Sequence, residues 1–233
     1  MTFATPHPPD DNGCDSLNVV ALAVLFAPFY LNDFANVYIH DWRTWLAIDY
    51  IFVKALPLLL VSWMVKRRQL SRAVLAYRMG SMRAVFMTLL LATGIGVFLD
   101  QNGYAAIAAL PGYSALGGMP GIPLPAVNWF DLTVGLAFVG LVEETVFRAV
   151  LAELLMHSED SGIVLTTVVS SLAFGLIHWS AGLHVVIVTS AIGAVFVLIY
   201  LRWRALAALA LAHAIVDFVD FADVVPKQLF KIL

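Results

Sequence analysis

The sequence predicts an all-α, polytopic membrane protein with about seven transmembrane helices. Of its 233 residues, 61% are hydrophobic and only 12% are charged, whereas a soluble domain has about a quarter charged residues. Apolar side chains must therefore face lipid, and a soluble globular enzyme is excluded. Seven apolar segments each approach the ~20 residues that span a bilayer as a helix. These segments are 17–39, 44–65, 83–100, 129–152, 162–180, 184–201 and 204–224.

The composition excludes several other classes of protein. The formal net charge of −3 offers no basic face for a nucleic acid. Cys14 is the single cysteine, so an intrachain disulfide and a cysteine-based metal cluster are excluded. Residues 1–16 hold three aspartates and no Lys or Arg, whereas a signal peptide begins with basic residues. We predict a disordered N-terminal tail at 1–16, followed by a single transmembrane helical domain at 17–233.

The first two apolar segments contain polar residues that are unusual for a membrane-spanning helix. Segment 17–39 contains Pro28 and becomes polar after Leu31, so a tilted, broken or re-entrant helix is an alternative to a full span. Segment 44–65 carries Asp49 and Lys54. Because ionisable groups are costly in lipid, we expect this helix to turn both side chains inward.

The distribution of Lys and Arg predicts the orientation in the membrane. Six of the thirteen basic residues lie in the loop between 44–65 and 83–100, and Arg202 and Arg204 lie between the last two segments. These loops are expected in the cytoplasm, with the N-terminus inside and the C-terminus outside. The small size, the lack of long soluble extensions and the absence of eukaryotic targeting signals favour a bacterial inner membrane.

One long connection, from Gly103 to Pro125, joins the third and fourth segments. It contains four prolines and five glycines and no Lys or Arg. This composition breaks helices. The connection is expected either to cover a site or to be disordered.

Two adjacent carboxylates, Glu143 and Glu144, lie within the apolar segment 129–152. Glu144 and Arg148 are four residues apart, so they share a helix face and can form an ion pair. Glu143 then points about 100° around the helix, toward a different neighbour, where it can accept a proton from water. The alternative is a buried ion pair that only locks helix packing. That alternative accounts for Glu144 and Arg148 but not for Glu143.

Two later segments bring histidines. His178 ends segment 162–180, and taken alone it is typical of an interfacial residue. His213 and Asp217 are four residues apart in the last segment, where a carboxylate can fix the orientation of an imidazole. Asp220 and Asp223 follow at the end of that helix and are interpreted as interfacial acids.

Polar groups on three helices are explained most simply by one shared polar cavity between the later helices, within a catalytic core at about 129–224. A carboxylate and an imidazole can activate water there, and a second imidazole can stabilise an oxyanion. Glu143, His178 and His213 could also hold zinc. Their spacing differs from the His-Glu-x-x-His of zinc proteases, so a metal is not demanded.

Three motifs of the sequence resemble those of the CPBP family, and they occur in the same order on successive apolar helices. They are Glu143-Glu144-x-x-x-Arg148, Phe174-x-x-x-His178 and His213-x-x-x-Asp217. This family comprises intramembrane proteases, including CAAX-processing endopeptidases, and bacteriocin-processing or immunity proteins. The resemblance covers Leu136 to Phe221.

The resemblance implies a role for each matching catalytic residue. Glu143 is similar to the catalytic glutamate of the family, and His178 to the histidine that helps it activate water. His213 and Asp217 match the pair on the oxyanion side. An acid donates a hydrogen bond to an oxyanion only when protonated, so Asp217 is expected to orient His213.

The remaining motif residues are implied to support the site, Glu144 and Arg148 as an ion pair and Phe174 by packing. The resemblance favours a glutamate-type, metal-free protease over a zinc enzyme. Its expected substrate is the C-terminal tail of a membrane-tethered protein or peptide. Two alternatives are a non-catalytic immunity or peptide-binding protein and a proton-coupled transporter, although no repeat symmetry supports the transporter.

Overall fold

A computed structural model describes residues 19–75, 77, 80–157 and 162–223 of the chain. The predicted tail at 1–16, Arg78 and the last ten residues lie outside these described residues. All regular secondary structure in the described ranges is helical, which confirms the all-α class.

Within the described residues, seven helical rods correspond to the seven predicted segments, with some differences at their ends. Two of the rods consist of α-helical and π-helical parts that follow one another without a break. The rods are α1 (Val19–Tyr38); α2 (Trp42–Ile48), η1 (Asp49–Ala55) and α3 (Leu56–Lys66); α4 (Met82–Ala106); α5 (Pro125–Phe130), η3 (Asp131–Gly135), α6 (Leu136–Glu144), η4 (Thr145–Ala152) and α7 (Glu153–His157); α8 (Ile163–Leu176); α9 (Leu183–Trp203); and α10 (Leu206–Phe221). Two short 3₁₀ turns, η2 (Arg72–Leu75) and η5 (Trp179–Ala181), lie in the connections.

In the part of the chain that the structure describes, four helical stretches are long and apolar enough to cross a membrane. They are Val20–Tyr38, Trp42–Lys66, Met82–Ala106 and Leu183–Trp203. These stretches confirm a polytopic membrane fold, and the number of seven spans stays a prediction. The first predicted segment forms one continuous helix that includes Pro28, so it is neither broken nor re-entrant.

Two predicted boundaries were wrong for identifiable reasons. The third helix continues past Asp100 to Ala106, because Asp100 and Asn102 turn toward the interior and are buried. Segment 162–180 leaves the helix at Leu176, and Gly182 in the following turn has a φ of +107°. The chain reverses there, since glycine adopts this backbone conformation without steric cost. His178 consequently lies in a turn rather than on a helix.

An exposed aspartate fixes the start of the second rod. Asp41 accepts hydrogen bonds from the backbone N–H of Thr44 at 3.0 Å and from its hydroxyl at 2.7 Å. The bond from the backbone N–H is the main reason that the pKa of Asp41 is lowered. Such a cap satisfies a backbone donor that the first turn of a helix leaves without a partner.

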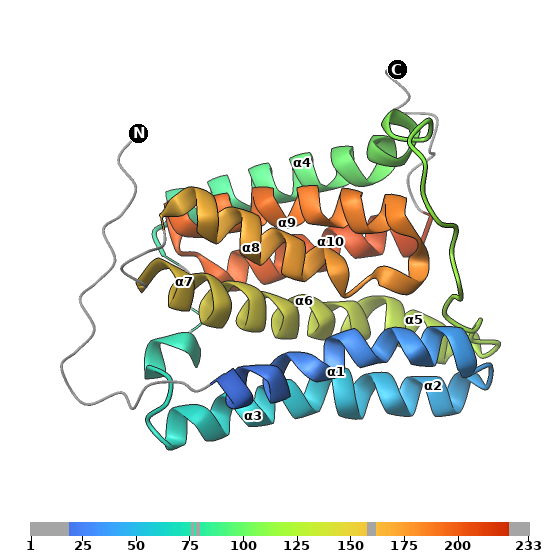
Figure 1. The fold of residues 1–233 in the computed structure, drawn as a ribbon, viewed down its shortest axis with the longest axis horizontal. Coiled ribbons are helices and arrows are strands. Elements are labelled where there is room, and N and C mark those ends of the chain that lie inside the picture. The colour runs from blue at the N-terminus through green and yellow to red at the C-terminus, as the bar shows by residue number, and fades with distance from the viewer. Residues whose placement is uncertain (1–18, 76, 78–79, 158–161, 224–233) are drawn as a thin grey trace.

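Consecutive rods run in opposite directions along the bundle (Figure 1). α4 packs against α9 and α10, α8 packs against α9, and α6 packs against α10. One end of the bundle, here called the basic end, carries the described basic residues in and directly beside the loops at 67–81 and 204–205. These residues are Lys66, Arg67, Arg68, Arg72, Arg83, Arg202 and Arg204. At the opposite end, Arg43 is the one Lys or Arg among the described residues.

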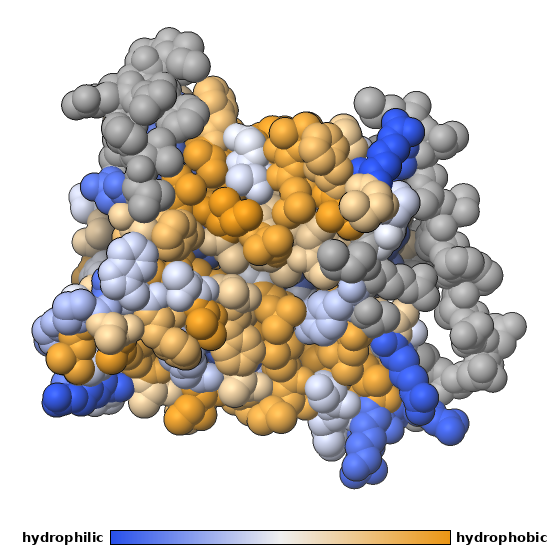
Figure 2. All heavy atoms as spheres, turned by 180° about the vertical axis from the view of Figure 1, so that it is seen from behind, coloured by the Kyte–Doolittle hydropathy of each residue, from blue (hydrophilic) through white to orange (hydrophobic). Residues whose placement is uncertain are grey.

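Large apolar side chains cover the sides of the bundle. Leu59, Met82, Phe86 and Val164 are each more than half exposed. On the face seen in Figure 2, apolar residues occupy the middle of the bundle, and hydrophilic residues gather toward its two ends. A belt of this kind is typical of a protein surrounded by lipid. The chain is therefore a multi-pass membrane protein.

Close packing at Gly140 sets α6 against α10. A Cβ atom at Gly140 would lie 2.5 Å from the carbonyl oxygen of Ala210 and 3.2 Å from the amide nitrogen of Ala214. Glycine at this position therefore lets the helix that carries Glu143 approach the helix that carries His213.

We expect Gly140→Ala to lower the free energy of unfolding by about 1–3 kcal/mol, because the added methyl group overpacks this contact. Thermal unfolding of purified protein in detergent measures the change. Gly94→Ala is the matched control, since a Cβ at Gly94 of α4 would meet nothing within 4 Å. Equal stability of the two variants would contradict the packing argument.

Candidate active site

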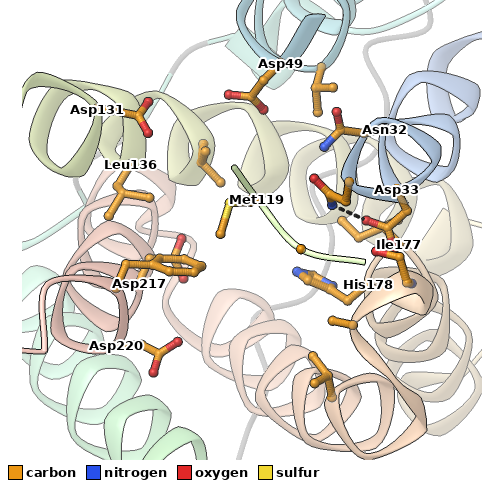
Figure 3. A pocket seen from close by; sticks show the side chains of 18 of the residues that line it. Asn32, Asp33, Asp49, Met119, Asp131, Leu136, Ile177, His178, Asp217 and Asp220 are labelled. Carbon is orange, nitrogen blue, oxygen red and sulfur yellow. Dashed lines mark hydrogen bonds between the residues drawn. The ribbon is translucent and has the colours of Figure 1, made fainter. Parts of the chain in front are cut away.

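A cavity of about 480 Å³ lies within the bundle, near the end opposite the basic end. Its walls come from α1, the second rod, α4, the rod that begins at Pro125, the turn at 177–181, α9 and α10. Residues 117–122 of the long connection also line it. Figure 3 shows the cavity with Met119 of that connection across it.

The four residues predicted to be catalytic line this one cavity. Glu143 comes from α6, His178 from the turn after α8, and His213 and Asp217 from α10. The predicted polar cavity between the later helices is thus present, and three separate elements contribute to it. Figure 3 shows the imidazole of His178 facing Asp217 across the cavity.

His213 lies at the centre of the polar contacts. Its Nδ1 is 2.8 Å from Oε1 of Glu144. Its Nε2 is 3.6 Å from Oε2 of Glu143 and 3.5 Å from Oδ2 of Asp217. Phe174 and Phe196 pack their edges against the ring, with centroid distances of 5.7 and 5.6 Å. These contacts fix the position of the ring. Its Nδ1 is hydrogen-bonded to Glu144, and its Nε2 faces the carboxylates of Glu143 and Asp217.

Glu144 and Arg148 form the predicted ion pair, with 3.1 Å between Oε2 and Nε. Both side chains are fully buried. The guanidinium lies 4.5 Å from the centre of the Phe174 ring, which accounts for the packing role predicted for this phenylalanine. From Glu144 the rod continues as the π-helix η4, a wider turn that is frequent at functional sites. The second contact of Glu144, to His213, was not predicted, because it joins residues 69 positions apart.

The turn that carries His178 is held by α1. Nδ1 of His178 lies 3.3 Å from the carbonyl oxygen of Phe174, four residues earlier in α8. The backbone N–H of Ser180 donates to Oδ2 of Asp33 at 2.6 Å, and the indole N–H of Trp179 donates to the carbonyl oxygen of Tyr30 at 3.0 Å. This support was not predicted, because the segment that forms α1 carries no recognisable motif.

The second rod turns its ionisable pair inward, as predicted. Lys54 and Asp49 form a buried ion pair, and both residues line the cavity. The hydroxyl of Tyr50 donates to Oδ1 of Asp131 at 2.9 Å, and Asp131 also lines the cavity. Sequence reasoning did not assign Asp131 to the site.

One interpretation of the last helix requires correction. Asp220 was interpreted as an interfacial acid, but it lines the cavity, one turn beyond Asp217. The register of α10 explains this, because residues three or four apart share a helix face. Asp223 is exposed beyond the end of the helix, and it is not among the described residues that line the cavity.

The long connection covers the cavity. The backbone N–H of Leu116 donates to the carbonyl oxygen of Ser180 at 2.7 Å, and that of Gly118 donates to the carbonyl oxygen of Asn36 at 3.0 Å. These bonds hold the connection between α1 and the turn of His178. At Gly117 a Cβ atom would lie 2.6 Å from Cα of Val37, so only glycine fits so close to α1. Of the two predicted alternatives, the structure supports the cover.

The three side chains considered as zinc ligands come from α6, the turn after α8, and α10. Within the described parts of the chain, no three His, Cys, Asp or Glu side chains are grouped so that they could hold a metal ion. Glu143, His178 and His213 share the cavity wall without forming such a group. The absence of a resident metal stays a prediction for this site.

Residues 125–219 match the family model described as type II CAAX prenyl endopeptidase Rce1-like. The matched range includes α6, the turn of His178 and most of α10, and thus all four candidate catalytic residues. No curated protein and no solved structure matches the chain. The family match supports an intramembrane protease that acts on a protein substrate within the lipid bilayer.

Proposed function

Since residues 125–219 belong to the type II CAAX prenyl endopeptidase Rce1-like family, we propose that the chain is an intramembrane endopeptidase of the glutamate type. It hydrolyses a peptide bond near the C-terminal tail of a membrane-tethered protein or peptide. One observation carries the proposal: Glu143, His178, His213 and Asp217 reach a single cavity from three elements.

In the proposed mechanism, Glu143 is the general base. The residue lines the cavity, and its Oε2 accepts no hydrogen bond within the described structure, although it lies 3.6 Å from Nε2 of His213. This supports a role in accepting a proton from a water molecule in the cavity. The water oxygen then bonds to the carbonyl carbon of the scissile peptide, and the electron pair of the C=O bond moves to the oxygen. His178 faces the same space and orients the attacking water.

His213 is proposed to stabilise the oxyanion. In this role the imidazole carries a proton on each nitrogen: Nδ1–H donates to Glu144, and Nε2–H can donate to the negative charge that develops in the cavity. Asp217, 3.5 Å from Nε2, attracts that proton and orients the ring. When the C–N bond breaks, Glu143 returns its proton to the leaving amine. The products are a new C-terminal carboxylate and the free amine of the released tail.

Cleavage by the purified protein tests this function. The full chain is reconstituted in lipid vesicles with peptides that consist of an apolar anchoring helix and a variable C-terminal tail. Mass spectrometry then detects a new C-terminus. We expect at least one peptide to be cut at a single bond in or near the anchor. Binding of peptides without cleavage of any would instead support the alternative, a non-catalytic immunity or peptide-binding protein.

Chelation tests the metal-free mechanism. We expect 1,10-phenanthroline and EDTA to leave the cleavage rate of the purified protein unchanged, because the carboxylate of Glu143 generates the nucleophile. A zinc enzyme would lose activity and regain it on addition of zinc. The same samples, analysed for bound metal by mass spectrometry, provide an independent readout.

The positions of the basic residues support one orientation of the protein in the membrane. We propose that the basic end lies in the cytoplasm, with the N-terminus inside and the C-terminus outside, in a bacterial inner membrane. The cavity then lies toward the outer face. In a Cys14→Ser background, Ser114→Cys should react with a membrane-impermeant maleimide on intact cells, and Ser71→Cys only after permeabilisation. Both serines are exposed, at opposite ends of the bundle. The opposite labelling pattern would contradict this orientation.

A further inference from the structure

His178 lies in a turn that its own backbone holds only loosely. The hydrogen bonds that the turn makes with itself are donated by the backbone N–H groups of Ile177, His178, Ala181 and Gly182, and they are 3.1 to 3.5 Å long. The usual length of such a bond is about 2.9–3.0 Å. The position of the imidazole therefore depends on contacts that reach the turn from outside.

Three shorter hydrogen bonds fasten the turn to its neighbours. The backbone N–H of Ser180 donates to Oδ2 of Asp33 in α1 at 2.6 Å. The carbonyl oxygen of Ser180 accepts from the backbone N–H of Leu116 at 2.7 Å, and the indole N–H of Trp179 donates to the carbonyl oxygen of Tyr30 at 3.0 Å. The bond to Asp33 is the shortest of the three, and it is the one whose acceptor is a side chain. A substitution can therefore remove it without altering the backbone.

Asp33 is itself held in one position. Its residue is only 5% exposed, and its Oδ1 accepts from Nδ2 of Asn36 at 2.9 Å. Oδ1 of Asn36 accepts in turn from the indole N–H of Trp45 in the second rod, at 2.8 Å. Both carboxyl oxygens of Asp33 thus have protein partners, although the residue lines the cavity on the same side as His178 (Figure 3). These contacts suit a residue that acts on the turn rather than on a ligand.

We propose that Asp33 is a positioning residue of the hydrolysis, which fixes residues 177–181 so that the ring of His178 is aligned with the attacking water. This inference rests on the proposed function and deepens it. It adds α1 to the working parts of the site, although α1 lies outside the family match at 125–219. A displacement of about 1 Å in a catalytic group can cost about 10²-fold in rate, so the support of a loosely held turn affects catalysis.

Two substitutions of nearly the same shape test the role of the carboxyl group. Asp33→Leu keeps the volume but accepts no hydrogen bond, whereas Asp33→Asn retains one acceptor oxygen. The full chain is reconstituted in vesicles with a peptide that the wild-type protein cleaves. We expect Asp33→Leu to lower kcat by about 10²-fold and to leave KM within about twofold. Asp33→Asn should lower kcat by only about tenfold, because a neutral acceptor binds an N–H more weakly than a carboxylate does.

A kcat of Asp33→Leu equal to that of the wild type would overturn the proposal. A loss that appeared in KM instead of kcat would also overturn it, since Asp33 would then bind substrate. If Asp33→Leu does not fold, Asp33→Asn decides alone, and an unchanged kcat of that variant would overturn the proposal.

Ser170→Ala is the matched control for a general loss of stability. Ser170 is fully buried in α8, and its hydroxyl donates to the carbonyl oxygen of Phe147 at 3.0 Å without touching the turn of His178. We expect this variant to unfold at a lower temperature in detergent but to cleave at the wild-type rate. If Ser170→Ala and Asp33→Leu lost kcat to the same extent, the effect of Asp33 would be general destabilisation and the positioning role would be rejected.

Chemical labelling of His178 needs no substrate, so it separates this inference from the function on which it rests. Diethyl pyrocarbonate modifies accessible imidazoles, and mass spectrometry gives the rate for each histidine, with the exposed His40 as internal reference. We expect His178 to react severalfold faster in Asp33→Leu than in the wild type, because the released turn opens locally. An unchanged rate would overturn the inference. Faster labelling, together with no cleavage of any peptide by the wild type, would count against the protease and leave Asp33 as the residue that holds the ring.

Discussion

Glu143→Gln is expected to reduce cleavage of a tail peptide by about 10²- to 10⁴-fold in kcat, the contribution typical of a general base. Glutamine keeps the size and the hydrogen-bonding capacity of the side chain but cannot accept the proton of the attacking water. Because the substitution leaves the cavity wall in place, the binding of a tail peptide with a neutral tail should change little. Single-turnover cleavage in vesicles measures the rate, and peptide binding is measured on the same samples.

Glu153→Gln is the matched control for this loss. Glu153 lies in α7, near the basic end, where it pairs with Arg204 away from the cavity. The control is expected to cleave at the wild-type rate. If Glu143→Gln also cleaved at that rate, the assignment of the general base would be refuted. A variant that protected cells against a peptide toxin without cleaving it would favour the immunity function instead.

The sequence predicted the parts of the site that follow from local spacing. Glu144 and Arg148 are four residues apart within one helix, so their ion pair could be foreseen. Asp49 and Lys54 were expected to face inward because lipid excludes charge, and they do. Ionisable residues in apolar segments are informative for this reason, since each one needs a partner or a cavity.

The contacts between distant segments could not be predicted in this way. The bond from Glu144 to His213 and the support of the His178 turn by Asp33 depend on how the helices pack. Single-sequence periodicity shows which face of a helix is polar, but not which neighbour it meets. Asp220 is a second residue whose surroundings depend on helix packing and could not be predicted from the sequence. Its position near a helix end was typical of an interfacial residue, whereas the packing of α10 places it in the cavity wall.

The second large effect concerns stability. Arg148→Met should lower the free energy of unfolding by about 3–5 kcal/mol, because it removes the guanidinium from a buried ion pair and leaves the Glu144 carboxylate with only its described contact to His213. Both side chains of this pair are fully buried. Methionine retains much of the apolar volume against Phe174, so the lost charge rather than a cavity dominates the effect. Thermal unfolding in detergent measures the change.

Arg202→Met is the control for loss of a cation at the surface. Arg202 is exposed at the basic end, against the ring of Trp203. Its replacement should change the stability by about 0.5 kcal/mol or less, as surface substitutions usually do. If the two Arg→Met substitutions lowered the free energy of unfolding by similar amounts, the buried ion pair would contribute no more to stability than a surface arginine does.

A double variant separates the charge of Glu144 from its hydrogen bond. In Arg148→Met combined with Glu144→Gln, no buried charge is left without a partner, while the glutamine carbonyl can still accept from Nδ1–H of His213. We therefore expect the double variant to be more stable than Arg148→Met alone, since the effects of contacting residues are not additive. If the double variant were as unstable as Arg148→Met, the cost would lie in lost packing. In that case Arg148 would stabilise the core through Phe174 and not through Glu144.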